Sequence, residues 1–117
     1  MDAIDTPLSQ LHQQYQDHLE ASGKANATVM AYTKDVEQLI KFLREHDIDN
    51  PDDVEDDHIE DFKDDLKKRR YTNKTISRKV NSIKSFFRFL DDENMIDSNP
   101  AEVVAHPKFE QKPPRIL

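Results

Sequence analysis

The apolar residues of this 117-residue chain recur every three or four positions in four successive segments. That spacing places them on one side of an α-helix, where neighbouring helices can bury them. The stripes are Leu8, Leu11, Tyr15 and Leu19; Val29, Tyr32, Val36, Leu39, Ile40 and Leu43; Ile59, Phe62 and Leu66; and Ile76, Val80, Ile83, Phe87 and Leu90. The pattern therefore predicts a compact all-α domain of four helices.

Residues that favour helix ends lie between these stripes. Thr6 fits the cap of the first helix, and Gly23 fits its end because glycine readily adopts the left-handed conformation. Asn26 is expected to cap the second helix, and Thr72 or Asn73 the fourth. The stripes and the capping residues therefore agree on where the helices begin and end.

The composition changes after the fourth helix. We expect one short helical turn from Pro100 to Val104, and from His106 onward the chain reads HPKFEQKPPRIL, with three prolines and no helical pattern. Such a segment is typical of a linker, and a domain that ends in one looks like a module cut from a longer chain. We therefore divide the chain into a helical domain, residues 1–105, and a linker, residues 106–117.

The totals exclude several classes of protein. There is no cysteine, which excludes disulfides and thiolate metal sites, and the single glycine excludes a glycine-rich phosphate loop. No apolar run approaches the roughly 20 residues that span a bilayer, and the N-terminus lacks the pattern of a signal peptide. We therefore expect a cytoplasmic protein that does not interact with a membrane.

Charge is sorted along the chain. The formal net charge is −7, from 17 Lys and Arg against 24 Asp and Glu, yet nine of the cations lie between Lys67 and Arg88, where there is no acid. Outside this stretch eight bases stand against all 24 acids. A basic segment in an acidic chain indicates a surface that meets polyanions.

The fourth helix places this charge on one face. At about 100° per residue, the side opposite its apolar stripe combines cations with short hydroxyl and amide side chains, which suit the backbone of a nucleic acid. The residues of this face are Lys74, Ser77, Arg78, Asn81, Lys84, Ser85 and Arg88. The alternative is an ordinary solvated face, but such faces usually mix both signs of charge.

The acidic run from Glu45 to Asp65 does not form a calcium loop. Pro51 stands where the third ligand belongs, Asp52 where glycine is required, and His58 where a bidentate Glu is needed. The run is better explained as a helix N-terminus rich in carboxylates, which the helix dipole favours. We expect the carboxylates of this run, and all others in the chain, to lie on solvated faces.

No catalytic constellation is visible. No two histidines have the i, i+4 spacing of a helical zinc site, and no GxSxG turn activates a serine. We therefore expect no metal, no cofactor and no enzymatic activity in this chain. Tyr15 and Tyr32 lie on apolar stripes and Tyr71 in a turn, so none is a candidate nucleophile.

Three segments resemble a known family. The second helix reads NATVMAYTKDVEQLIKFL, the fourth reads TISRKVNSIKSFFRFL, and the tail begins with Asn-Pro-Ala. In order and spacing they resemble the N-terminal core-binding, SAM-like domain of tyrosine recombinases of the Xer and phage-integrase type. The matching positions are Thr28, Tyr32, Asp35 and Val36, then Thr75, Ile76, Arg78, Val80, Ile83, Lys84 and Phe86.

The resemblance implies a four-helix SAM-like domain made of two crossed helical hairpins, with a short extra C-terminal helical turn. It also implies that the second and fourth helices lie against double-stranded DNA during recombination or integration. The family's catalytic residues belong to a domain that would follow Leu117. The implied partners are therefore duplex DNA, the catalytic domain of the same parent chain, and further recombinase protomers, which form a tetramer in the family.

These observations lead to a DNA-binding hypothesis. Cations on the fourth helix would neutralise phosphates, Asn81 is the best candidate to read a base, and the N-terminal half of the second helix would add contacts. The expected DNA-binding residues are Lys24, Thr28, Lys34, Lys74, Ser77, Arg78, Asn81, Lys84, Ser85 and Arg88. The alternative is a helical protein-interaction module whose basic face binds an acidic partner.

Overall fold

The computed structural model describes residues 7–105, which form four α-helices and one short 3₁₀ helix. The helices are α1 (Pro7–Ala21), α2 (Asn26–Glu45), η2 (Pro51–Asp53), α3 (Asp56–Lys68) and α4 (Asn73–Asp92). No strand occurs within these described residues. The all-α class and the four predicted helices are therefore confirmed, whereas η2 was not predicted.

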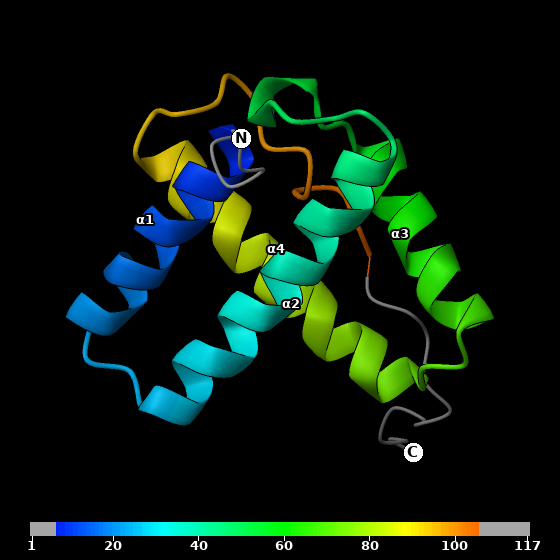
Figure 1. Ribbon diagram of the computed structural model, residues 1–117, viewed down its shortest axis with the longest axis horizontal. Coiled ribbons are helices and arrows are strands. Elements are labelled where there is room, and N and C mark those ends of the chain that lie inside the picture. The colour runs from blue at the N-terminus through cyan, green and yellow to red at the C-terminus, as the bar shows by residue number, and fades with distance from the viewer. Residues whose placement is uncertain (1–6, 106–117) are drawn as a thin grey trace, which may run out of the picture.

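The helices pair as two hairpins that cross. A tight turn joins α1 to α2, another joins α3 to α4, and α2 crosses α4 at the centre of the molecule (Figure 1). The most extensive helix packing is between α2 and its neighbours α4 and α1. This arrangement places α2 and α4, the two helices expected to meet DNA, against each other.

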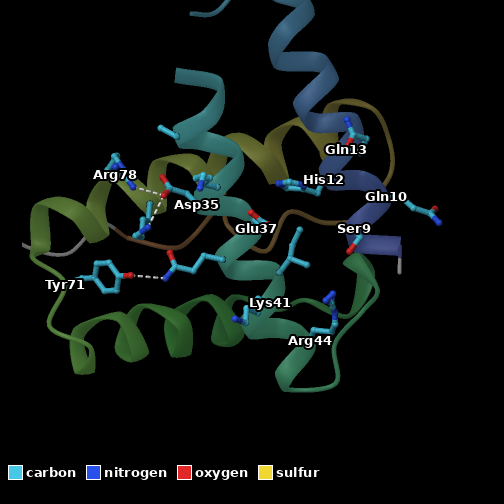
Figure 2. Close-up of a pocket in the computed structure, with 15 residues that line it drawn as sticks. Ser9, Gln10, His12, Gln13, Asp35, Glu37, Lys41, Arg44, Tyr71 and Arg78 are labelled. Carbon is cyan, nitrogen blue, oxygen red and sulfur yellow. Dashed lines mark hydrogen bonds and ion pairs between the residues drawn. The ribbon is translucent and has the colours of Figure 1, made fainter. Parts of the chain in front are cut away.

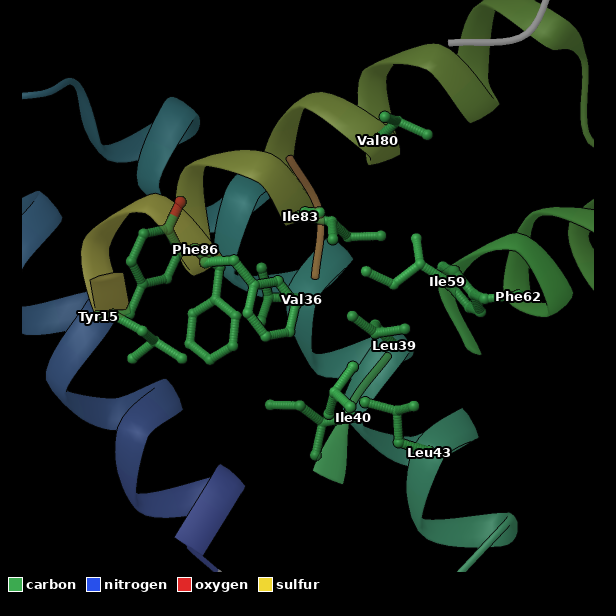
Figure 3. Packing of buried hydrophobic residues seen from close by; sticks show 14 of the residues in the cluster. Tyr15, Val36, Leu39, Ile40, Leu43, Ile59, Phe62, Val80, Ile83 and Phe86 are labelled. Atoms are coloured by element: carbon green, nitrogen blue, oxygen red, sulfur yellow. The ribbon is translucent and has the colours of Figure 1, made fainter. Parts of the chain in front are cut away.

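Aromatic and aliphatic side chains from all four helices fill the core (Figure 3). The rings of Tyr15 and Phe86 meet edge to face with centroids 5.3 Å apart, and Phe86 meets Phe87 in the same way at 5.1 Å. Phe62 brings α3 into this cluster. Burying a large apolar side chain contributes about 1.5–3 kcal/mol, so these rings contribute strongly to holding the two hairpins together.

Two of the predicted helix ends are confirmed and one is wrong. Gly23 adopts φ 84° after α1, and the Thr72 hydroxyl accepts a hydrogen bond from the Thr75 amide at 3.1 Å, as an N-cap does. Asn26 is not the cap of α2. The Ala25 carbonyl already accepts the bond from the Val29 amide at 3.0 Å, so Asn26 is the first helical residue.

The start of α3 confirms that the acidic run leads into a helix. Asp56 and Asp57 lie in its first turn, where the dipole favours them. Glu55 and His58 form a reciprocal capping box, in which the Glu55 amide donates to Nδ1 of His58 at 2.9 Å. The residue that failed as a calcium ligand therefore caps a helix.

The chain returns along the bundle after α4. Ile96, Ala101 and Val104 are buried, and the amide of Val104 bonds to the carbonyl of Ala101 at 3.2 Å. The expected short helical turn is present as hydrogen-bonded turns rather than as an α-helix. The proposed linker, residues 106–117, and the proposed cap Thr6 lie outside the described residues.

Within residues 7–105, no helix is both long enough and apolar enough to cross a membrane.

Candidate nucleic-acid interface

A polar groove of about 1050 Å³ lies over the outer side of α2 (Figure 2). The first half of α1 forms one wall, and Tyr71 with Arg78 forms the other. Its charged lining residues are the cations Lys34, Lys41, Arg44, Arg78 and Lys79 and the acids Asp35 and Glu37. The groove is therefore positive although the chain as a whole is negative.

A buried carboxylate joins α2 to α4 at the edge of this groove. The Asp35 side chain is 2 % exposed and accepts bonds from Arg78 Nη2 at 2.7 Å and Lys79 Nζ at 3.0 Å. Ser82 donates to its other oxygen at 2.8 Å. Two cations and one carboxylate leave this cluster with a net positive charge, and the charge-assisted bonds fix how the two helices cross.

Tyr71 closes the groove at the turn before α4. Its ring lies under the ammonium of Lys79, 5.3 Å from the centroid, and its hydroxyl accepts a hydrogen bond from Gln38 at 3.3 Å. Both contacts link the turn to the α2–α4 crossing (Figure 2). The wall that Tyr71 forms is therefore held in place by one cation–π contact and one hydrogen bond.

The outer ridge of α4 carries the exposed part of the predicted face. Lys74, Arg78, Asn81 and Arg88 are exposed, and Ser77 is half-buried between them. The Arg78 side chain remains 51 % exposed despite its ion pair with Asp35. These side chains lie on one side of α4, and no acid of α4 lies among them, because the sequence has none between Lys67 and Arg88.

Two residues of the predicted face have partners inside the protein. Lys84 donates to the Ala101 carbonyl at 2.8 Å and thereby fastens the segment after α4. Ser85 accepts a hydrogen bond from the Tyr15 hydroxyl at 2.8 Å and links α4 to α1. Lys84 and Ser85 are both half-buried, so they present less of their side chains at this surface than Lys74, Asn81 and Arg88 do.

The residues predicted on α2 lie in two places. Lys34 lines the groove, near Arg78 of α4. Lys24 is exposed in the turn before α2, and Thr28 is half-buried in the first turn of the helix; neither lines the groove. The structure therefore brings Lys34 together with Arg78 at the groove and leaves Lys24 and Thr28 at the far end of α2.

Sequence reasoning missed several groove residues. Lys41 and Arg44 follow Lys34 by seven and ten positions, so helical spacing already placed all three on one side of α2. They form no ion pair with any other described residue, and Arg44 Nε is buried without a hydrogen-bond partner there. The signal that identifies them is this shared side of α2, which lies outside the basic stretch from Lys67 to Arg88.

The expectation that all carboxylates face solvent was wrong for Asp35. This residue lies three positions after Tyr32 and four before Leu39, both on the apolar stripe of α2. Its burial therefore follows from its spacing, once α4 supplies the cations that make a buried carboxylate tolerable.

Tyr15 is a packing residue. Its side chain is fully buried, and this burial raises the pKa of the phenol to about 12. Among the described residues, no three His, Asp or Glu side chains gather as metal ligands would.

Comparisons with known proteins place this architecture in a family. A family model described as the phage integrase N-terminal SAM-like domain matches residues 11–97. Tyrosine recombinase XerC of Roseiflexus castenholzii is 37 % identical over 90 residues, which are 77 % of this chain and 29 % of that relative. A tyrosine recombinase of Pseudothermotoga lettingae is 33 % identical over 113 residues, covering 94 % of this chain and 39 % of its own length.

A third relative, tyrosine recombinase XerC of Listeria monocytogenes, is 31 % identical over 113 residues, which are 96 % of this chain and 38 % of the relative. The chain thus spans well under half the length of these relatives. No solved structure gives a significant match. The family match over most of the chain, together with the four helices, shows that this protein belongs to the phage integrase N-terminal SAM-like domain family.

Proposed function

We propose that this domain binds double-stranded DNA as the N-terminal part of a site-specific tyrosine recombinase. The observation that carries the proposal is the acid-free α4 ridge, which meets the positive α2 groove at Arg78. The relatives are named tyrosine recombinases, and the substrate of a recombinase is DNA, which is a long polyanion. The charge sorting of this chain suits such a ligand.

The contacts divide between the two helices. Lys74, Arg78 and Arg88 neutralise phosphates along α4, and Lys34 with Lys41 extends the positive surface across α2. Asn81 lies at the centre of the exposed ridge, where its amide can pair with a base edge. Lys24, Thr28 and Ser77 add backbone contacts, whereas Lys84 and Ser85 support the ridge through their internal hydrogen bonds.

Binding should depend steeply on salt. With about five neutralised phosphates, log K should fall with log salt at a slope of about −4 to −5. Lys74→Gln and Arg88→Gln should each weaken binding to duplex DNA and make this slope less steep by about one. The measurement is fluorescence anisotropy of a labelled duplex across a salt series.

The matched control is Gln14→Glu, which changes the net charge by the same amount at an exposed α1 position outside the groove. It should leave the slope unchanged, because it removes no phosphate contact. If Lys74→Gln and Arg88→Gln bind as tightly as the control with the same slope, the ridge does not bind DNA.

An acidic protein partner is the competing function. A salt series does not separate the two, because both depend on charge. Duplex DNA, heparin and an acidic peptide, compared at equal ionic strength, do separate them. Preference for the peptide, with no binding of duplex, would favour the interaction module.

The rest of the recombinase is part of the same proposal. The curated relatives are longer than this chain, and we propose that residues 106–117 connect the helical domain, residues 1–105, to a catalytic domain. The two domains would hold the duplex from opposite sides, and several protomers would assemble on it. Because the proposed ligand is cellular DNA, the proposed location is the cytoplasm.

A further inference from the structure

Asp35 is the one carboxylate that is buried among residues 7–105. All three of its hydrogen-bond donors come from α4, from positions 43 to 47 residues further along the chain. It lies at the edge of the groove beside Arg78, where the ridge of α4 meets the groove (Figure 2). A buried charge in this place needs an explanation beyond helix packing, since an apolar residue would pack at lower cost.

The geometry holds the carboxylate from two directions. Arg78 and Lys79 share one oxygen, at 2.7 and 3.0 Å, and Ser82 donates to the other at 2.8 Å. Because both oxygens are occupied, the carboxylate has a fixed orientation. The group that it binds at the surface, the guanidinium of Arg78, is therefore held in a fixed place as well.

Arg78 keeps most of its donors. A guanidinium carries five N–H groups, so the bond to Asp35 leaves four of them, and half of the side chain is exposed at the groove. An arginine that is already ordered loses less conformational freedom when it binds a phosphate. We propose that Asp35 is a positioning residue, which holds the guanidinium of Arg78 in the orientation that receives a DNA phosphate. This inference rests on the DNA-binding function proposed above.

Lys79 has a different part in the cluster. Its side chain lines the groove but is only 9 % exposed, because its ammonium lies over the ring of Tyr71 and bonds to Asp35. Lys79 therefore balances the buried charge of Asp35. This balance leaves the positive charge of Arg78 available at the surface.

The proposal predicts a change in DNA affinity opposite to the one that net charge alone would give. Removing a carboxylate from a DNA-facing surface raises the local positive charge, which by itself strengthens binding. Glu37→Gln, an exposed position of the same groove, should follow this rule. Asp35→Asn should instead weaken binding, because it frees the Arg78 side chain.

The principal test uses Asp35→Asn combined with Lys79→Met. This double variant removes both buried charges together, keeps the net charge of the chain, and avoids stranding an ammonium in the interior. We expect it to bind duplex DNA about two- to tenfold more weakly than the unchanged 117-residue chain. Thermal unfolding followed by circular dichroism shows whether each variant is folded at the assay temperature.

A third variant separates positioning from a structural effect. In an Arg78→Ala background, adding Asp35→Asn and Lys79→Met should cause no further loss, since Asp35 acts through Arg78. Undiminished binding by the double variant, or an equal loss in the Arg78→Ala background, would overturn the inference even if Arg78→Ala alone weakens binding. If Arg78→Ala and the ridge variants all bind normally, the proposed function itself fails.

Discussion

Charged side chains at the α2–α4 crossing and on α3 differ in how much they contribute to the tertiary structure. At the crossing, Asp35 is buried and its partners are more than 40 residues away in the sequence. At the C-terminal end of α3, the ion pair between Arg69 and Asp65 is local, one helical turn apart, and its side chains are 57 % and 32 % exposed. Long-range buried pairs specify a tertiary arrangement, whereas local exposed pairs contribute little to it. The buried charges at the crossing therefore hold the proposed interface in its shape, whereas the exposed charges of α3 affect only the electric field around it.

The largest expected effect on stability comes from removing the buried charge at the α2–α4 crossing. Asp35→Asn leaves the buried ammonium of Lys79 without its counter-ion and should lower the free energy of unfolding by about 3–5 kcal/mol. Asp61→Asn removes the same charge from an exposed position on α3 and should change it by less than about 0.5 kcal/mol. Urea denaturation followed by circular dichroism measures both. Equal effects would mean that the crossing does not depend on its buried pair.

Tyr15 provides a second buried polar group, whose contribution to stability can be measured by changing the pH. Its pKa of about 12 in the folded protein lies above the ordinary value of 10.0, because burial disfavours the phenolate. The stability that this gives is complete below pH 10 and is lost as the pH rises toward 12, by about 2–3 kcal/mol. Tyr15→Phe should lack this part of the alkaline loss. The measurement is urea denaturation at a series of pH values from neutral to 12.

Tyr15→Phe also acts as its own control for other groups that titrate at alkaline pH, since those groups are the same in both proteins. The difference between the two stability profiles therefore reports Tyr15 alone. Parallel profiles up to pH 12 would show that the phenol is not desolvated as the packing against Phe86 indicates.

The helices were predictable because their signals are local. The apolar stripes lie within each helix, and the turn at Gly23 and the cap at Thr72 depend on single residues. The η2 turn at Pro51 and the replacement of Asn26 by Ala25 as the cap of α2 were missed, since backbone geometry one residue away decides them.

The site was predictable only in part, for a physical reason. The basic face of α4 follows from charge and helical spacing, but the partners of its side chains depend on which helices cross it. Lys84 bonds to Ala101 and Arg78 to Asp35, across 17 and 43 residues of sequence. No local pattern distinguishes these two cations, which have the same sign and lie on the same predicted face.

The smallest expected effect concerns the acids of α3. Asp57, Asp61 and Asp64 are exposed, and we expect them to act on DNA only through the long-range field. Changing all three to Asn should strengthen DNA binding by about two- to threefold at low salt, and the gain should shrink as salt rises, because screening acts within about 10 Å at 0.1 M. The same anisotropy series measures it, with Glu37→Gln in the groove for comparison. A gain that persists at high salt would place these carboxylates in direct contact with the duplex and would end the distinction between the two regions.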